Sequence, residues 1–365
     1  MTRHSLATVL TVPVVAALAI ASLSGCSRRT SSADDIATAG ARTSPAAQLR
    51  LGYFPNVTHA VPVLGVADGT YRKDLGSTKL TTQTFNAGPA ATEALVAGSV
   101  DAVYVGPNPA INAYVKTGGA VRLIAGGASG GAALVVKQGI TSIADLAGKT
   151  LADPQLGGTQ DIALKYFLKQ HGFTVNGSGP KNVTVVSEDN AQTLQLFQQG
   201  TIDGGWLPEP WATRLEVQGG AHQLVNEKSQ WPGGNFITTN LLVSTKYLNA
   251  HPDTIEALLR AQVQTAEYIR ANPAKAAIQI DAALTKLNGK ALPKGVTAKA
   301  LANVSVGWDP YAASLQEVAA HAVDVGLLKK PDLAGLYDLT PLNNVLKSLG
   351  LPAVSADGLE AKAAS

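Results

Sequence analysis

Short loops rich in glycine, proline and small polar residues recur along this chain, and most of them directly precede a predicted helix. The first amides of a helix have no intrahelical partner and lie at the positive end of its dipole, so such loops can hold an anion. Glycine also lets the backbone approach a ligand closely. None of the loops contains Lys or Arg, which favours an anion held by neutral donors. They span residues 56–59, 87–89, 106–108, 129–131, 157–160 and 208–211.

Each candidate in these loops has an alternative explanation. The glycines could serve turn geometry alone, the hydroxyls and amides could cap helices, and a single loop histidine is more often a surface or packed residue. Glu209 is a carboxylate where an anion is expected; it could receive an amine, or pair with Arg214 away from the ligand, which we favour. Phe85, Tyr104 and Trp206 could line an apolar side or pack in the core. The candidate ligand-binding residues are Asn56, His59, Gly88, Pro107, Asn108, Ser129, Gly130, Gly158, Thr159, Gln160, Glu209 and Trp211.

The sequence argues against several other classes of protein. It contains no nucleophile elbow, HExxH motif or Walker loop, so no catalytic residues are expected. The six histidines lack metal-ligand spacing and Cys26 is the only cysteine, so neither a metal, another cofactor nor a disulfide is expected. The net charge is only +3, and Lys and Arg are scattered, which argues against nucleic-acid binding.

Strand-like and helix-like segments alternate along the chain with short Gly/Pro punctuation, which predicts an α/β fold with mostly parallel strands. After residue 252 the pattern becomes helical, with Ile255, Leu259, Val263 and Ala266 on one face. We predict strands over 49–53, 81–85, 99–105, 121–125, 150–152 and 236–243, and helices over 89–96, 109–115, 298–304, 314–327 and 342–349.

Residues 93–110 and 194–211 form an internal repeat. Both segments read as a helix, a glycine, [Ser/Thr]-[Val/Ile]-Asp, a short strand, and Pro-x-Pro at the start of another helix. Glycine suits the end of a helix and proline suits the first turn. Helix–Gly–strand units are common, but the shared Asp and Pro-x-Pro favour two lobes of similar construction.

The amino terminus carries an export signature. Residues 7–23 form an apolar stretch that ends in Leu-Ser-Gly-Cys, and a plain signal peptide or a membrane span are the alternatives. We predict a lipoprotein signal peptide over 1–25 and lipidation of Cys26. Residues 26–48 read as a flexible tether and 353–365 as a tail.

Taken together, these residues resemble the substrate-binding proteins of ABC importers for sulfonates, taurine and nitrate, and most of all the aliphatic sulfonate-binding proteins. The resemblance implies the type II periplasmic-binding-protein fold, with two lobes joined by two crossing strands and a ligand cleft between them. Lobe one would comprise 49–135 and 236–352, including the C-terminal helices, and lobe two 136–235. The segments that carry the resemblance are 49–56, 85–89, 93–101, 142–149, 154–161 and 202–211.

The resemblance further implies a monomeric, lipid-anchored protein on the outer face of the cytoplasmic membrane or in the periplasm, working with an ABC permease and ATPase. The expected solute is a small organic anion, first of all an aliphatic sulfonate. A sulfonate has three acceptor oxygens and no proton to give, so neutral donors suffice. Nitrate, taurine or a thiamine pyrimidine precursor remain alternatives, as do a pyrimidine-synthase-like enzyme and a solute sensor on the same fold.

Overall fold

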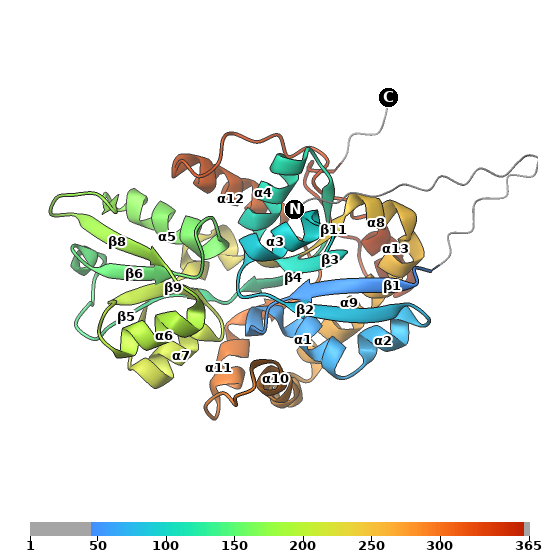
Figure 1. Ribbon diagram of the computed structural model, residues 1–365, viewed down its shortest axis with the longest axis horizontal. Coiled ribbons are helices and arrows are strands. Elements are labelled where there is room, and N and C mark those ends of the chain that lie inside the picture. Colours follow the sequence, from blue (N-terminus) through green and yellow to red (C-terminus); the bar gives the residue numbers. More distant parts are fainter. Residues whose placement is uncertain (1–44, 361–365) are drawn as a thin grey trace, which may run out of the picture. The chain divides into compact units, whose positions relative to one another are not determined.

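The computed structural model describes residues 45–360, so Cys26, the predicted signal peptide and most of the predicted tether lie outside the described residues. Two six-stranded sheets dominate the structure (Figure 1). The first has the order β12-β4-β11-β3-β1-β2, and the second β10-β5-β9-β6-β8-β7. The strands are β1 (Gln48–Tyr53), β2 (Lys79–Thr84), β3 (Ala102–Val105), β4 (Val121–Gly130), β5 (Ala132–Val136), β6 (Thr150–Asp153), β7 (Thr174–Val175), β8 (Asn182–Ser187), β9 (Gly204–Pro208), β10 (His222–Asn226), β11 (Ile237–Ser244) and β12 (Val304–Val306).

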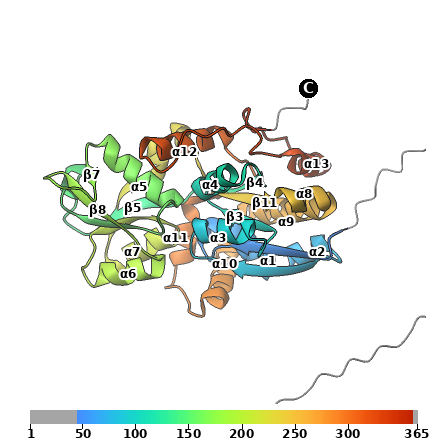
Figure 2. The same ribbon diagram turned by 45° about the horizontal axis from the view of Figure 1, so that its top comes forward.

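Helices cover both faces of each sheet. In the first sheet α3, α4 and α12 lie on one side and α1 and α10 on the other; in the second, α5 lies opposite α6 and α7 (Figures 1 and 2). The helices are α1 (Ala60–Ala67), α2 (Thr70–Leu75), α3 (Gly88–Val96), α4 (Pro107–Thr117), α5 (Thr159–Gln170), α6 (Asn190–Gln198), α7 (Trp211–Gly219), α8 (Thr245–Ala250), α9 (Pro252–Ala271), α10 (Pro273–Asn288), α11 (Val296–Ala302), α12 (Ala312–Asp324) and α13 (Thr340–Ser348), with 3-10 helices η1 (Val57–His59), η2 (Ile143–Leu146), η3 (Glu227–Gln230) and η4 (Pro232–Gly234).

Each sheet has its own core, as two lobes require. The predicted apolar face of α9 is confirmed, because Ile255, Leu259, Val263 and Ala266 are all fully buried against the first sheet's core. The second sheet carries one apolar cluster on the α5 side and another on the α6 and α7 side. We call the first sheet with its helices lobe one and the second lobe two.

The prediction of mostly parallel strands is wrong. Strand pairs divide evenly between parallel and antiparallel. Every antiparallel pair involves β4, β5 or β11, the strands nearest the points where the chain passes between the lobes. Because the chain crosses to lobe two and returns, these strands run against their neighbours and produce mixed sheets.

The two connections between the lobes differ. β4 leads into β5 through Gly131, and both Gly130 and Gly131 have a φ of 75°, which glycine adopts at little cost. β5 begins at Ala132, ahead of the predicted lobe boundary at 136. The return from β10 passes through η3 and η4 before β11, so this connection contains two 3-10 helices rather than one crossing strand.

Both ends of the described chain are packed where the sequence predicted flexible segments. Ala46, inside the predicted tether, is buried, and its N–H donates to Thr254 Oγ1 at 2.8 Å. Ala356 and Leu359, inside the predicted tail, are also buried, and the Leu359 carbonyl accepts from the Tyr337 N–H. These segments lack periodicity because single small or apolar residues dock on a core built elsewhere.

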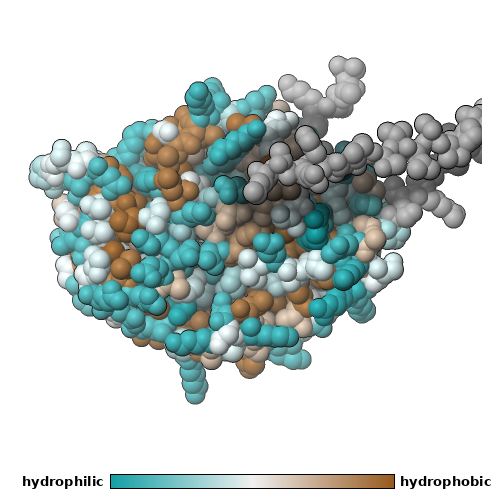
Figure 3. Space-filling view, viewed as in Figure 1, coloured by the Kyte–Doolittle hydropathy of each residue, from teal (hydrophilic) through white to brown (hydrophobic). Residues whose placement is uncertain are grey.

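The face seen in Figure 3 mixes hydrophilic and hydrophobic residues. Most of the exposed large apolar side chains lie on separate elements, for example Val96 on α3 and Val217 on α7, while α10 carries two, Ile278 and Leu287, which is normal for a folded domain. Within residues 45–360 no helix combines the length and the apolar character that a membrane crossing needs.

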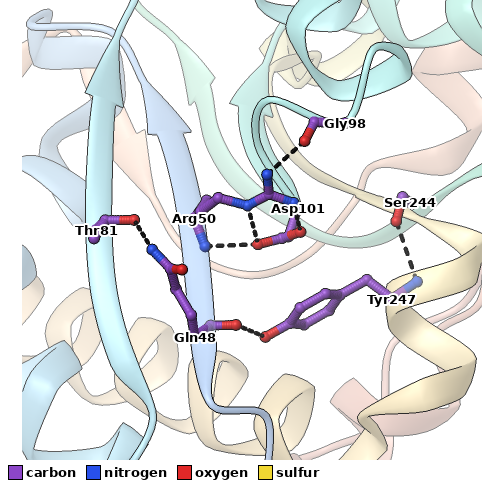
Figure 4. Close-up of polar contacts among 7 residues, drawn as sticks. All are labelled: Gln48, Arg50, Thr81, Gly98, Asp101, Ser244 and Tyr247. Atoms are coloured by element: carbon purple, nitrogen blue, oxygen red, sulfur yellow. Dashed lines mark hydrogen bonds and ion pairs between the residues drawn. The ribbon is translucent and has the colours of Figure 1, made fainter. Parts of the chain in front are cut away.

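The internal repeat corresponds to α3–β3–α4 in lobe one and α6–β9–α7 in lobe two. In lobe one the shared aspartate, Asp101, accepts from the backbone N–H of Arg50 at 2.8 Å and from its guanidinium at 2.5 and 3.0 Å. Arg50 also donates to the Gly98 carbonyl (Figure 4). Gly98 has a φ of 74°, as expected after a helix end.

Lobe two repeats this network with lysine in place of arginine. Asp203 accepts from the Thr150 N–H at 2.9 Å and from Lys137 Nζ at 3.2 Å. Lys137 donates also to the Gly200 carbonyl at 3.1 Å. The shared aspartates therefore hold neighbouring strands together just before β3 and β9 begin. The candidate loops lie at the opposite ends of these two strands.

Candidate anion-binding cleft

A small cavity of about 30 Å³ lies between the lobes, where the carboxyl ends of strands from both sheets meet. One water needs about 10–15 Å³ of such space, so only a small polar group fits. Most of the residues lining it belong to the predicted loops or lie next to them, and none of the lining residues carries a formal charge. They are Phe54, Asn56, Thr58, His59, Asn86, Ala87, Gly88, Gly106, Pro109, Pro154, Gln155, Gly158, Thr159, Gln160, Asn190, Pro208 and Thr238.

Lobe one contributes a neutral histidine. His59 ends η1, is buried and stacks on Phe54 with ring centroids 4.2 Å apart. Burial lowers the pKa of His59 to about 3, so the ring carries no charge. Its Nδ1 accepts from the Phe54 N–H at 3.3 Å, which places the ring proton on Nε2. His59 is therefore a packed residue, which was one of the alternatives considered for a single loop histidine. Its Nε2–H remains able to donate a hydrogen bond.

Asn56 connects the cleft to lobe two. Its Oδ1 accepts from the Trp211 indole N–H at 2.9 Å, and its amide NH₂ is left to donate. Val57 and Thr58 donate their backbone N–H groups to the Glu209 carbonyl at 3.1 and 3.3 Å. These bonds between lobes hold the start of η1 against the β9–α7 loop.

Lobe two contributes the start of α5. Gly158 is the N-cap, and Thr159 and Gln160 follow in the first turn. Neither side chain forms a hydrogen bond to another residue in the described part of the chain, so both can donate to a ligand together with the free first-turn amides. Thr159 also marks where the lobes touch: a Cβ added to Gly106 of lobe one would lie 2.1 Å from Thr159 Oγ1.

Two buried carboxyl groups, those of Asp161 and Asp153, lie close to the first turn of α5. Asp161 accepts from the Gly157 N–H at 2.8 Å and pairs with Lys165 at 2.5 Å. Asp153, at the end of β6, accepts from the Ser187 hydroxyl at 2.9 Å. Burial, and then the charge of Asp161, raises the pKa of Asp153 to about 7. Neither aspartate lines the cavity.

The cavity brings together Asn56, His59, Gly88, Gly158, Thr159 and Gln160 of the predicted set. Pro107 and Asn108 lie outside its lining, although their neighbours Gly106 and Pro109 line it. Asn108 is buried at the start of α4.

Ser129 and Gly130 also lie outside the lining, because both serve the connection between the lobes. Ser129 Oγ accepts from the Phe236 N–H at 3.3 Å. The Gly130 carbonyl accepts from the Thr238 hydroxyl at 2.6 Å.

The favoured pairing of Glu209 with Arg214 is wrong. The Glu209 carboxylate is buried away from the cavity and accepts from the Thr213 hydroxyl at 2.9 Å, the Thr213 N–H at 3.1 Å and Asn303 Nδ2 at 2.7 Å. Burial raises its pKa. The contact with Asn303 was not recognisable in the sequence, because Asn303 lies far along the chain.

The predicted aromatic residues divide between core and cleft. Tyr104 is buried and hydrogen-bonded to Tyr71 at 2.7 Å, and Trp206 is buried and donates to Glu227 at 2.6 Å. Phe85 and Trp211 instead line a second cavity of about 420 Å³ beside the first.

Asn86 and Asn190, which were not among the predicted site residues, line both cavities. Asn86 follows β2 and Asn190 follows β8 with two intervening residues, so the rule that ligands bind beyond strand carboxyl ends could have found them. Asn86 Nδ2 donates to Asp189 of the other lobe at 3.0 Å. The residues described hold no group of His, Cys, Asp or Glu that could bind a metal ion.

The cleft lies in a fold shared with known binding proteins. Residues 42–284 match the NMT1-like family, and the chain belongs to that family. The alkanesulfonate-binding protein SsuA of Xanthomonas axonopodis pv. citri, solved with MOPS bound, has a TM-score of 0.65 at 24% identity, covering 79% of this chain and 96% of that one. The nitrate-binding protein NrtA of Synechocystis PCC 6803 has a TM-score of 0.70 at 15% identity, covering 84% and 90%.

Among sequence relatives, the taurine-binding periplasmic protein of Escherichia coli K12 is 28% identical over 208 residues, or 57% of this chain. The alignment spans 62% of that relative's length. The predicted two-lobed fold and the resemblance to sulfonate, taurine and nitrate binding proteins are confirmed. Each of these three proteins is named as a binding protein.

Proposed function

We propose that this protein captures a small organic anion with a sulfonate head outside the cytoplasm and delivers it to an ABC permease and ATPase. The observation that carries the proposal is the small cavity between the lobes, lined by neutral donors from both. A sulfonate stays ionised and needs only hydrogen-bond donors. Holding it without Lys or Arg also leaves release possible, which an importer requires.

The surroundings of the cavity favour a sulfonate without an amine over taurine, and an organic sulfonate over nitrate. The amine of taurine is best paired with a carboxylate, but Glu209 is buried among its own donors and Asp189 already accepts from Asn86, which leaves neutral amide oxygens for the amine. Nitrate would leave the adjoining 420 Å³ cavity unused. An organic tail attached to the anionic head would use both spaces.

A ligand screen tests the solute class. Propane-1-sulfonate should raise the melting temperature more than taurine, nitrate, sulfate or hydroxymethylpyrimidine, because ligand at a hundred times its Kd adds about 2.7 kcal/mol. Thr159→Ala with Gln160→Ala should weaken that binding by about 2–4 kcal/mol, since bonds to a charged group are lost. As a control, Thr184→Ala with Gln199→Ala changes the same residue types at exposed positions of lobe two. Absence of binding by every sulfonate, or full affinity in the first double variant, would overturn the proposal.

We also propose that Cys26 is lipidated and anchors the protein to the outer face of the cytoplasmic membrane, with 1–25 removed as the signal peptide. The support is the placement of the only cysteine at the end of the apolar stretch. Radiolabelled palmitate should enter the wild-type protein and not Cys26→Ala. Equal labelling of both would exclude the anchor.

A further inference from the structure

The second cavity contains a cation without a carboxylate partner. Arg214 of α7 lines this cavity and is half-buried. Its guanidinium carbon lies 4.1 Å from the centre of the Trp211 ring, and its Nε donates to Gln218 Oε1 at 2.8 Å. Within residues 45–360 Arg214 forms no ion pair. A half-buried charge without a counter-charge is unfavourable, and burial lowers the pKa of Arg214 accordingly.

Two contacts restrain the guanidinium group of Arg214. Its carbon atom lies over the Trp211 ring, and the bond to Gln218 uses Nε. The two terminal nitrogens remain available in the fork that binds a carboxylate through two parallel hydrogen bonds.

The second cavity continues the anion site. Asn56, Asn86 and Asn190 line both cavities. These three side chains therefore lie on the boundary between the two cavities, and the tail of a ligand whose head occupies the small cavity would have to pass between them to reach the larger one. At about 420 Å³ the larger cavity falls in the usual range for small-molecule sites.

The charges lining the larger cavity favour a second anionic group. Its charged residues are Arg214, Lys290 and Asp189. Asp189 already accepts a hydrogen bond from Asn86, and the two cations outnumber this single carboxylate in the lining of the cavity. Phe85, Trp211 and Leu292 supply the apolar contact that a short carbon chain needs.

We propose that the preferred solute is a bifunctional anion, with a sulfonate in the small cavity and a carboxylate or second acid group held by Arg214 in the larger one. This inference rests on the proposed function and specifies its substrate class. Arg214 is then a specificity-determining residue that contacts the solute's tail.

The test compares two ligands of equal chain length, propane-1-sulfonate and 3-sulfopropanoate, by isothermal titration calorimetry on the wild-type protein. The sulfopropanoate should bind about tenfold more tightly, because a bidentate charge-assisted pair adds to the same head contacts. This preference should shrink at high salt, since Arg214 is only partly buried.

Arg214→Gln should abolish the preference, so that the variant binds the two ligands with equal affinity. Arg214→Lys keeps the charge without the fork and should retain part of the preference. Lys181→Gln removes one exposed charge from lobe two outside both cavities and should leave the preference intact.

The two proposals fail in different ways. Equal affinity of both ligands in the wild-type protein, or a preference that survives Arg214→Gln, would overturn the bifunctional solute and leave sulfonate binding in place. Absence of binding by both ligands would remove the proposed function itself. The wild-type comparison decides even if a variant fails to fold.

Discussion

Glu227 is a buried carboxyl group that connects a single residue to the stability of the whole protein. It begins η3 and accepts from the Trp206 indole N–H at 2.6 Å. Burial raises the pKa of Glu227 to about 7. In the unfolded chain it titrates near the ordinary value of about 4.3. Because the folded form holds the proton more tightly, the stabilisation is fully present below about pH 4 and is lost as the pH rises through about 7.

Glu227→Gln should therefore flatten the dependence of the free energy of unfolding on pH between about 4.5 and 7. The wild-type protein should lose about 3 kcal/mol from this group over that range. Asp153, whose pKa is raised to about 7 as well, should keep part of the slope in the variant. Urea unfolding at a series of pH values measures the effect. The exposed Glu93→Gln should reproduce the wild-type slope, and an unchanged slope in Glu227→Gln would contradict the prediction.

The sequence predicts residues of the cleft where local pattern is enough. Gly158, Thr159 and Gln160 are recognisable because a glycine followed by donors opens a helix. The environment of a side chain is different, since it depends on segments far along the chain. Glu209 illustrates this: Asn303 provides one of its donors, and no local pattern links the two positions.

The two aspartates of the internal repeat, Asp101 and Asp203, connect neighbouring strands, and we expect them to contribute unequally to stability. Asp101 is nearly buried and meets a two-point guanidinium contact, whereas Asp203 meets a single lysine and is more exposed. Both also accept a backbone N–H of the neighbouring strand. Removing either carboxylate leaves that N–H unpaired, which adds to the loss of the ion pair.

Asp101→Ala should lower the free energy of unfolding by about 3 kcal/mol, and Asp203→Ala by about half as much, because exposed ion pairs contribute little. Chemical denaturation measures both. Asp101→Asn keeps an acceptor for the Arg50 N–H and should recover part of the loss. An equal cost for the two alanine variants would show that the arginine and lysine networks are equivalent.

The alternation of helices and strands, the apolar face of α9 and the internal repeat follow from patterns of hydrophobicity and Gly/Pro placement, and the sequence predicts them. The direction of strand pairing does not follow from such patterns. β4 and β11 are buried along almost their whole length, as central strands of either orientation are. Their antiparallel pairing depends on where the chain crosses between the lobes, which tertiary structure decides.

At the scale of the whole molecule, polar contacts join the lobes on several sides of the cleft. Lys169 of α5 pairs with Asp324 of α12 at 3.0 Å, and Lys299 of α11 pairs with Glu216 of α7 at 2.5 Å. Both lysines are largely exposed, so each pair adds at most about 1 kcal/mol. Contacts of this strength can be broken when a solute leaves. We therefore expect the bound anion, which receives hydrogen bonds from both lobes, to decide whether the two lobes stay closed.

Gly106→Ala should therefore hinder closure. The added methyl group would lie 2.1 Å from Thr159 Oγ1, so either Thr159 turns away from the anion or the lobes stay apart. In small-angle scattering the wild-type protein should become more compact on adding propane-1-sulfonate, and Gly106→Ala should lose most of this change together with about tenfold in affinity. Gly307→Ala is the matched control, because no atom lies within 4 Å of its added Cβ. Compaction and affinity equal to wild type in Gly106→Ala would show that the contact between Gly106 and Thr159 is not required for the bound state.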